Sequence, residues 1–152
     1  MIAILQRVSR ASVSVDGVTV ARCGKGFLIL LGVARGDGEE DCRLLADKIS
    51  KLRVFQDENG RMNLSVCDVG GSLMVVPNFT LLASYRKGNR PDFLGSAPPE
   101  TAEPLFEYFT DYISGLVPDT ERGIFGADMK VDLLNDGPVT IAMDSNVLKK
   151  KQ

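Results

Sequence analysis

The chain has 152 residues, a formal net charge of −2, 44% hydrophobic residues and 25% charged residues. These values are typical of one ordinary globular domain and exclude a disordered or fibrous chain. The sequence contains no histidine, which excludes histidine-activated nucleophiles and histidine metal ligands. No other metal-binding cluster is recognisable, so we expect neither a metal nor a cofactor. Any chemistry then depends on carboxylates, hydroxyls, lysines, backbone groups or the substrate itself.

The cysteines and the hydrophobicity of the chain indicate its compartment. Cys23, Cys42 and Cys67 are odd in number and widely spaced, which favours free thiols in a reducing environment. No segment approaches the roughly 20 apolar residues that a membrane-spanning helix needs, and residues 1–10 lack the basic start of a signal peptide. We therefore expect a cytoplasmic protein with no membrane partner. The net charge argues against broad phosphate binding but allows local contact with a nucleic-acid end.

The first half of the chain predicts strands and one helix. Apolar and polar residues alternate over residues 2–15, which predicts extended structure. Asp16-Gly17 predicts a hairpin turn into a second strand, since glycine tolerates the positive φ of a tight turn. Residues 27–31 form a continuous apolar run typical of a strand buried on both faces. Residues 39–51 predict a helix, with acidic residues in the first turn, lysines near the end and apolar residues at helical spacing.

The second half predicts further strands around a second helix. Residues 72–82 predict a central strand that is interrupted at Pro77, because proline has no N–H to donate to a sheet. Residues 84–99 are polar and rich in glycine and proline, which predicts a long functional or mobile loop. Apolar residues at helical spacing predict a helix over residues 99–116. The remaining elements are a strand at 131–134, a turn at 135–138 and a closing strand at 139–142.

Two segments, residues 77–81 and 135–140, have two interpretations each. In the structural interpretation, the first is a strand with a proline bulge and the second is a turn before the last strand. In the functional interpretation, the break at Pro77 leaves free backbone N–H groups near Phe79 and Thr80. Such groups could form an oxyanion hole beside a hydroxyl, which suits an ester hydrolase without histidine. The residues alone leave both interpretations open.

Five segments occur in a fixed order along the chain: MIAILQRVSRASVSVDG at 1–17, RMNLSV at 61–66, GGSLMVVPNFTLLA at 70–83, NRPDF at 89–93 and NDGPVT at 135–140. Together they resemble the D-aminoacyl-tRNA deacylase family, whose diagnostic motifs are normally Ser-Gln-Phe-Thr-Leu and Asn-x-Gly-Pro-Val-Thr. The resemblance covers nearly all of residues 1–145. We therefore expect one domain over residues 1–145 and a basic C-terminal tail over residues 146–152, in which the lysines at 149–151 form a solvated, frayed terminus.

The resemblance implies a fold and an activity. The fold is α/β, with mixed β-sheets rolled into a barrel-like core, two main flanking helices and a homodimeric assembly. The activity is hydrolysis of the ester that joins a D-amino acid, or mischarged glycine, to the 3′-terminal adenosine of tRNA, as chiral proofreading in translation. Aminoacyl-tRNA is therefore the expected partner, besides a second copy of the chain.

The resemblance also implies the roles of five residues. Phe79 and Thr80 line the pocket around the reacting ester as catalytic residues, and Asn78 contacts the substrate. Gly137 and Pro138, joined by a cis peptide bond, reach into the pocket of the other subunit. Carbonyl groups held there would bind the ammonium group of the amino acid and leave no room for an L side chain. Glycine, which has no side chain, would not be rejected.

Thr80 has two interpretations. It is the obvious nucleophile, but an unactivated threonine hydroxyl is a weak nucleophile and its segment contains no general base. Alternatively, the ribose 2′-hydroxyl of the substrate assists the reaction while the backbone N–H groups of Phe79 and Thr80 hold the oxyanion. The absence of histidine favours this substrate-assisted interpretation.

One departure from the family pattern leaves a second specificity open. Pro77-Asn78 stands where the family usually has Ser-Gln. A proline at this position is similar to a related animal deacylase that clears mischarged L-alanyl-tRNA. Phe79 and the segment at 135–140 fit the D-specific family better.

The loop at residues 84–99 carries the best local phosphate ligands, Arg86, Lys87 and Arg90. We expect them to bind tRNA, although a solvated basic loop is an equally good interpretation of each residue. A non-catalytic nucleic-acid-binding module that uses this loop is the rival from another functional class. Such a module would need neither of the two family motifs.

Overall fold

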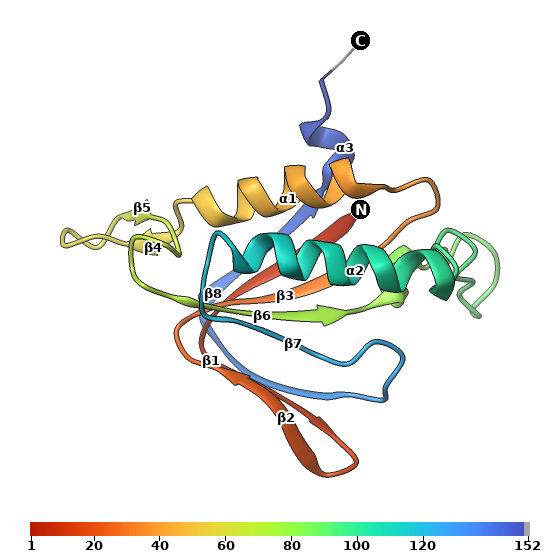
Figure 1. Cartoon of the computed structure of the whole chain (residues 1–152), viewed down its shortest axis with the longest axis horizontal. Helices are drawn as coiled ribbons and strands as arrows, with labels where there is room; N and C mark the ends of the chain where they lie inside the picture. The colour runs from red at the N-terminus through yellow and green to blue at the C-terminus, as the bar shows by residue number, and fades with distance from the viewer. Residues whose placement is uncertain (151–152) are drawn as a thin grey trace.

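The long first strand organises the sheet. In the computed structural model, which describes residues 1–150, this strand pairs antiparallel with three others, β2, β3 and β8 (Figure 1). Its side chains alternate between buried and less buried positions over its first half, as the alternation in the sequence predicts. The strands of the sheet are β1 (Ile2–Val15), β2 (Val18–Cys23), β3 (Gly26–Gly32), β6 (Ser72–Pro77), β7 (Thr120–Arg122) and β8 (Lys130–Asp144).

The sheet is mixed and nearly closes into a barrel. Its strand order is β2-β1-β3-β6-β7, and β8 also pairs with β1. The pairs β3–β6 and β6–β7 are parallel. β2 lies close to both β6 and β7, so the two ends of the strand order approach each other. A separate two-stranded sheet of β4 (Phe55–Gln56) and β5 (Met62–Leu64) projects at one end of the molecule (Figure 1).

Two main helices, α1 (Glu39–Lys51) and α2 (Pro99–Ser114), lie over one face of the sheet (Figure 1). The bounds of α1 are those predicted, with acidic residues in its first turn and lysines in its last, as the helix dipole favours. Two short helices, η1 (Phe79–Leu82) and α3 (Ser145–Leu148), follow β6 and β8. Within residues 1–150, no helix has the length and apolar character to cross a membrane.

Buried apolar side chains form two clusters, one on each face of the sheet. β3 and β6 contribute to both, because successive side chains of a strand point to opposite faces. Phe27 and Leu73 pack under the helices, whereas Leu28 and Met74 point into the barrel. The three cysteines are free. The predicted α/β fold with a barrel-like core and two main flanking helices is thus confirmed, and the homodimer stays a prediction.

Three predicted elements differ from the structure. Residues 79–82 form the 3-10 helix η1 instead of continuing a strand. The predicted turn at 135–138 lies within the single strand β8, because shifts in the register between β1 and β8 accommodate it as irregularities of the ladder. The second helix ends at Ser114 rather than at residue 116, since the N–H of Gly115 already closes the last turn by bonding to carbonyls behind it.

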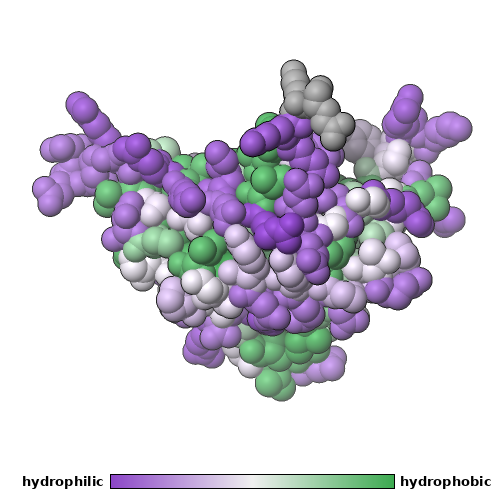
Figure 2. Space-filling view, turned by 45° about the horizontal axis from the view of Figure 1, so that its top comes forward, coloured by the Kyte–Doolittle hydropathy of each residue, from purple (hydrophilic) through white to green (hydrophobic). Residues whose placement is uncertain are grey.

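Outside the two clusters, apolar side chains gather at the end of the molecule formed by the β1–β2 hairpin (Figure 2). Val18 and Val20 on β2 are exposed there, by 64% and 39%. Most of the remaining surface in this view is polar. An exposed apolar patch of this kind marks a surface for contact with another molecule.

The amino group of Met1 is buried in a polar network that joins both ends of the chain. It donates a hydrogen bond of 2.8 Å to Ser145 Oγ, which in turn donates one of 2.6 Å to Asp41 Oδ1. Lys149 Nζ lies 2.8 Å from the same carboxylate oxygen. Burial by itself raises the pKa of Asp41. Hydrogen bonds from Lys149, Ser145 and the N–H of Gly38 outweigh this effect and lower the pKa to about 2.

This network corrects the prediction for the end of the chain. The sequence predicts a solvated terminus at residues 149–151. Lys149 is instead held against the buried Asp41, because a buried carboxylate is stable only when it is paired. The last two residues of the predicted tail, 151–152, lie outside the described residues.

We expect Asp41→Asn to lower the free energy of unfolding by about 1–3 kcal/mol at pH 7, because the variant keeps the shape but loses the ion pair. The folded-state pKa of about 2 lies below the usual value of about 3.9. The contribution of Asp41 is therefore present above about pH 4 and is lost as pH falls toward 2. Urea unfolding at several pH values should show a weaker acid dependence in the variant. The control is Asp132→Asn, whose side chain is 71% exposed; equal acid dependence in both variants would contradict the assignment.

Candidate active site

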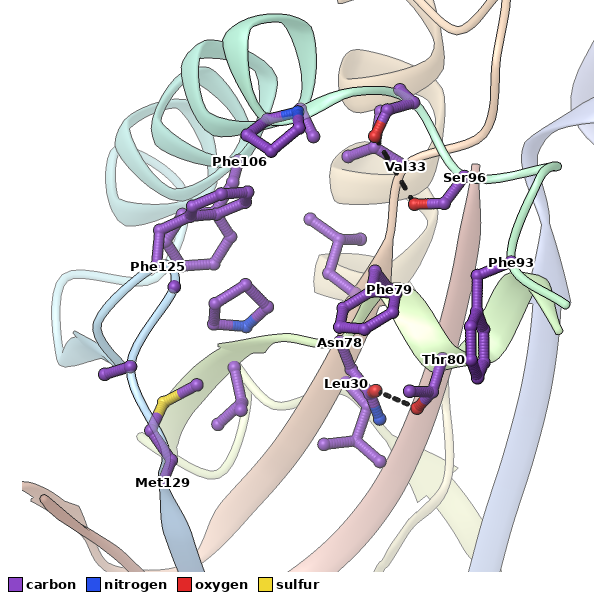
Figure 3. Close-up of a pocket in the computed structure, with 18 of the residues that line it drawn as sticks. Leu30, Val33, Asn78, Phe79, Thr80, Phe93, Ser96, Phe106, Phe125 and Met129 are labelled. Atoms are coloured by element: carbon purple, nitrogen blue, oxygen red, sulfur yellow. Dashed lines mark hydrogen bonds between the residues drawn. The ribbon is translucent and has the colours of Figure 1, made fainter. Parts of the chain in front are cut away.

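A cavity of about 820 Å³ opens where β3, β6 and the N-terminal part of α2 meet. Phe106, Phe125 and Met129 line one side of it, and Asn78, Thr80 and Phe93 lie on the other (Figure 3). The lining is mainly apolar, and its polar side chains are Asn78, Thr80, Ser96 and Asp128. A cavity of this size with a few convergent polar groups is typical of a small-molecule site.

The end of β6 places the predicted segment in this cavity. Pro77 pairs with Leu31 as the last residue of β6, and the N–H of Asn78 donates a 2.8 Å hydrogen bond to the carbonyl of Leu31. The chain then turns into η1, which packs against β3 at Gly32. A Cβ on Gly32 would lie 2.6 Å from a methyl group of Leu82 and 3.1 Å from the carbonyl oxygen of Asn78, so any larger residue would force η1 and the Leu82 side chain to shift.

Phe79 and Thr80 open η1 and are both exposed at the cavity. Among the described residues, neither backbone N–H has a hydrogen-bond partner, as expected for the first positions of a helix. The Phe79 ring packs edge-on against Phe93, with 5.2 Å between the ring centroids. Two backbone N–H groups without a hydrogen-bond partner thus belong to residues that line the cavity, and an oxyanion hole is built from donors of this kind.

The hydroxyl of Thr80 donates a hydrogen bond to Oδ1 of Asn78 (Figure 3). An amide oxygen is not a base, so this contact orients the hydroxyl without activating it. Within residues 1–150, no carboxylate or lysine forms a hydrogen bond with Thr80. The structure therefore brings Asn78, Phe79 and Thr80 together but gives Thr80 no general base.

Several lining residues were not recognised from the sequence. Phe106 comes from α2, and Phe125 and Met129 come from the turn between β7 and β8. The sequence around Gly126 reads as an ordinary turn, and its positive φ of 80° fits that reading. The only feature of the sequence that could indicate a site here is the aromatic character of Phe106 and Phe125, and nothing in the sequence shows that these two side chains face the same cavity.

Gly137 and Pro138 are exposed on β8 and do not line the cavity of their own chain. The peptide bond between them is cis. The segment is braced by Arg7, a buried residue whose Nε donates a 3.0 Å hydrogen bond to the carbonyl of Asp136. On the other side, the N–H of Val139 donates a 3.0 Å hydrogen bond to the side chain of Asn135. The Gly-Pro pair is therefore a fixed feature of the surface.

The basic residues Arg86, Lys87 and Arg90 are all exposed and lie outside the cavity lining. Their loop is closed at its base by two backbone hydrogen bonds between Ser84 and Asp92, of 2.8 and 2.9 Å. Phe93, the next residue, lines the cavity. The loop therefore begins at the edge of the site and projects from it.

Residues 4–144 match the family described as D-Tyr-tRNA(Tyr) deacylase. The chain belongs to this family. The match spans the cavity residues, the basic loop and the Gly137-Pro138 segment. The resemblance inferred from the five sequence segments is confirmed.

Individual relatives agree with this family. The chain is 54% identical to a D-aminoacyl-tRNA deacylase of Anaeromyxobacter dehalogenans, over 97% of this chain and 99% of the relative. It is 49% identical to one of Dictyoglomus turgidum, over 99% and 96%. Among solved structures, the c-Myc DNA Unwinding Element Binding Protein is similar, with a TM-score of 0.90 and 39% identity over 95% and 98%. A probable eukaryotic D-amino acid tRNA deacylase, at 15% identity and a TM-score of 0.79 over 93% and 97%, shares the fold.

The position of Arg7 allows a test of the brace on the family's Gly-Pro segment. Arg7→Met keeps the apolar stem but removes hydrogen bonds to two carbonyls, those of Asp136 and Val54. We expect the free energy of unfolding to fall by about 2–3 kcal/mol, because two partly buried carbonyls lose a charged donor. The matched control on the same strand is Arg10→Met, since Arg10 and its ion-pair partner are exposed by 62% and 71%, and it should lose less than about 0.5 kcal/mol. Similar losses in chemical unfolding of the two variants would contradict the brace.

Proposed function

We propose that this chain hydrolyses the ester bond of D-aminoacyl-tRNA, and of mischarged glycyl-tRNA, and so releases the free amino acid and tRNA in translation proofreading. The observation that carries the proposal is the membership of residues 4–144 in the deacylase family together with two free N–H groups at the cavity. We infer that the enzyme acts in the cytoplasm, where aminoacyl-tRNA is used. Its substrate partner is the 3′-terminal aminoacyl-adenosine.

The shape and chemistry of the cavity support this substrate. Its volume of about 820 Å³ lies within the range of roughly 300–1,000 Å³ that holds ligands of nucleoside size. Aromatic walls at Phe79, Phe93, Phe106 and Phe125 suit flat rings. The polar groups of Asn78 and Thr80 lie at the same wall as the free N–H groups. We therefore place the ester at Phe79 and Thr80, with Asn78 as a substrate contact.

The proposed mechanism is assisted by the substrate. As water attacks the ester carbonyl, negative charge develops on the carbonyl oxygen, and the N–H groups of Phe79 and Thr80 stabilise it. The 2′-hydroxyl of the ribose lies next to the ester and relays the proton of the attacking water. The ester C–O bond then breaks, and the 3′-oxygen leaves as the protonated hydroxyl of the tRNA. Thr80 fixes Asn78 in this scheme and forms no covalent bond to the substrate.

Chirality is selected, in our proposal, by a second copy of the chain. Gly137 and Pro138 are exposed and braced by Arg7, so they are suited to enter the cavity of a partner. Their fixed carbonyls would bind the ammonium group of the substrate and exclude an L side chain by lack of space. This role requires a homodimer. The exposed apolar residues at the β1–β2 hairpin give a subunit contact a suitable surface.

A second candidate function is non-catalytic nucleic-acid binding. It is favoured by the name of one similar structure, the c-Myc DNA Unwinding Element Binding Protein, which is 39% identical to this chain. Arg86, Lys87 and Arg90 would serve either function as phosphate ligands. Release of the amino acid from its ester separates the two candidates.

The test of the proposed function compares D-tyrosyl-tRNA, L-tyrosyl-tRNA and L-alanyl-tRNA under single-turnover conditions. We expect D-tyrosyl-tRNA to be hydrolysed at least about tenfold faster than either L substrate, because exclusion acts on the L side chain. Faster release of L-alanine would assign the chain to the related L-alanyl specificity that Pro77 allows. A chain that binds tRNA but accelerates no hydrolysis would support the binding module instead.

Thr80→Ala and a 2′-deoxy substrate distinguish the two mechanisms. If the substrate assists, Thr80→Ala should lower single-turnover rates by about tenfold, the value of one hydrogen bond. Replacing the terminal ribose by 2′-deoxyribose should lower them by about 100-fold or more, the value of a proton relay. Near-complete loss of turnover in Thr80→Ala with unchanged tRNA binding would make Thr80 the nucleophile. Thr101→Ala, a threonine exposed on α2, is the matched control.

A further inference from the structure

The loop between η1 and α2 is a closed structure with rigid ends and a basic tip. Hydrogen bonds between Ser84 and Asp92 close it, and its exit is held by Arg35 on the far side. The N–H of Arg35 donates a 3.0 Å hydrogen bond to the carbonyl of Gly95, and its Nε donates one of 2.6 Å to the carbonyl of Leu94. The tip is thus held in place by its base and presents its side chains to solvent.

Tyr85 is the most exposed large hydrophobic residue in the described part of the chain, at 83%. Its hydroxyl forms no hydrogen bond with the described residues. Tyrosine combines a large apolar ring with a polar hydroxyl, and side chains of this kind are enriched at interfaces. The ring of Tyr85 is therefore accessible for stacking with a flat ring of a binding partner.

The charges around Tyr85 indicate the kind of partner. Arg86, Lys87 and Arg90 follow it within the loop, and residues 85–91 contain no acidic residue. The next carboxylate along the chain, that of Asp92, accepts a 3.2 Å hydrogen bond from the N–H of Leu94. Polar side chains project from this end of the molecule (Figure 2). An aromatic platform beside several cations is the combination that binds single-stranded nucleic acid, through base stacking and phosphate contacts.

The place of the loop fixes which part of a nucleic acid it would meet. Tyr85 follows Thr80 by five residues, so their Cα atoms lie within about 18 Å. The other end of the loop returns to the cavity at Phe93, which packs against Phe79. The loop is therefore within reach of the nucleotides that precede a terminal nucleoside bound in the cavity.

We propose that Tyr85 stacks on an unpaired base that precedes the terminal adenosine of the RNA substrate, while Arg86, Lys87 and Arg90 hold the adjoining phosphates. The inference rests on the proposed function for the identity of the RNA. It adds a binding site for the single-stranded 3′ end that lies outside the ester pocket. Stacking on the face of a base does not depend on the identity of the base, so the same contact can bind tRNAs for any amino acid.

The first experiment measures binding of an RNA minihelix that ends in unpaired CCA, by fluorescence anisotropy at low salt. Tyr85→Ala should weaken binding by about 5- to 100-fold, the range for loss of one stacked base. Tyr85→Phe keeps the ring and should bind within about twofold of the original chain. The matched control is Leu94→Ala, because Leu94 is 72% exposed next to the same loop but has no π face; its affinity should not change. A minihelix without CCA should bind the original chain and Tyr85→Ala equally.

The second experiment separates RNA binding from the ester pocket. Tyr85→Ala should raise the concentration of D-tyrosyl-tRNA that gives half-maximal single-turnover rate, and should leave hydrolysis of 3′-O-(D-tyrosyl)adenosine unchanged. The triple substitution of Arg86, Lys87 and Arg90 by alanine should reduce the salt dependence of minihelix binding.

Four outcomes would overturn the inference. The first two are unchanged minihelix binding by Tyr85→Ala and an equal loss of affinity in Leu94→Ala. The third is slower hydrolysis of the adenosine ester by Tyr85→Ala. The fourth is a changed sedimentation coefficient of Tyr85→Ala without a change in RNA binding, which would place Tyr85 in a subunit contact. Failure of the proposed function gives a different result. An original chain that binds the minihelix through Tyr85 but releases no D-tyrosine would overturn the hydrolase proposal and leave the RNA contact standing.

Discussion

The inability of β6 to continue as a paired strand beyond Pro77 determines the site. The last bond of this edge joins the N–H of Asn78 to the carbonyl of Leu31, and after it the chain turns into η1. The N–H groups of Phe79 and Thr80 then have no hydrogen-bond partner among the described residues, and both residues line the cavity. Gly32 allows η1 to lie against β3. A proline, a glycine and one backbone hydrogen bond together produce both the cavity wall and its free donors.

The segment that we propose to act in the cavity of a second subunit lies on β8, outside the cavity of its own chain. Arg7 and Asn135 hold the segment around Gly137 and Pro138 from opposite sides, although that segment does not line the cavity. Burial of Arg7 removes water from its guanidinium group, which is unfavourable. Its hydrogen bonds to the carbonyls of Asp136 and Val54 offset this loss. An exposed but rigid segment is what the proposed exchange between two subunits needs. The absence of histidine fits a site made of such fixed backbone groups.

Recognition is divided between two regions of different character. The cavity, which we propose as the site of the terminal nucleoside, is mainly apolar, while the loop after η1 carries three cations and an exposed tyrosine. The chain as a whole has a net charge of −2, so its affinity for RNA depends on this local concentration of positive charge. Contacts of this kind position the substrate and leave the chemistry to the pocket.

Individual helices and strands could be predicted from the sequence because each is indicated by residues within the element itself. The bounds of α1, the alternation in β1 and the break at Pro77 come from periodicity and from the missing N–H of proline, and each agrees with the structure. The residues from 79 to 82 were assigned to a strand because their apolar character suits a strand as well as a short helix. Packing against Gly32 decides between these.

The sequence by itself determined the family, the end of β6 at Pro77 and the absence of histidine catalysis, because motifs and composition carry that information. Only the tertiary structure brought Phe106, Phe125 and Met129 to the wall opposite Asn78 and Thr80. It also joined Met1 to Ser145 and placed Lys149 on Asp41. These partners lie far apart in sequence. Their meeting depends on how the sheet curls and where the helices pack, and neither is encoded in the pattern of any one segment.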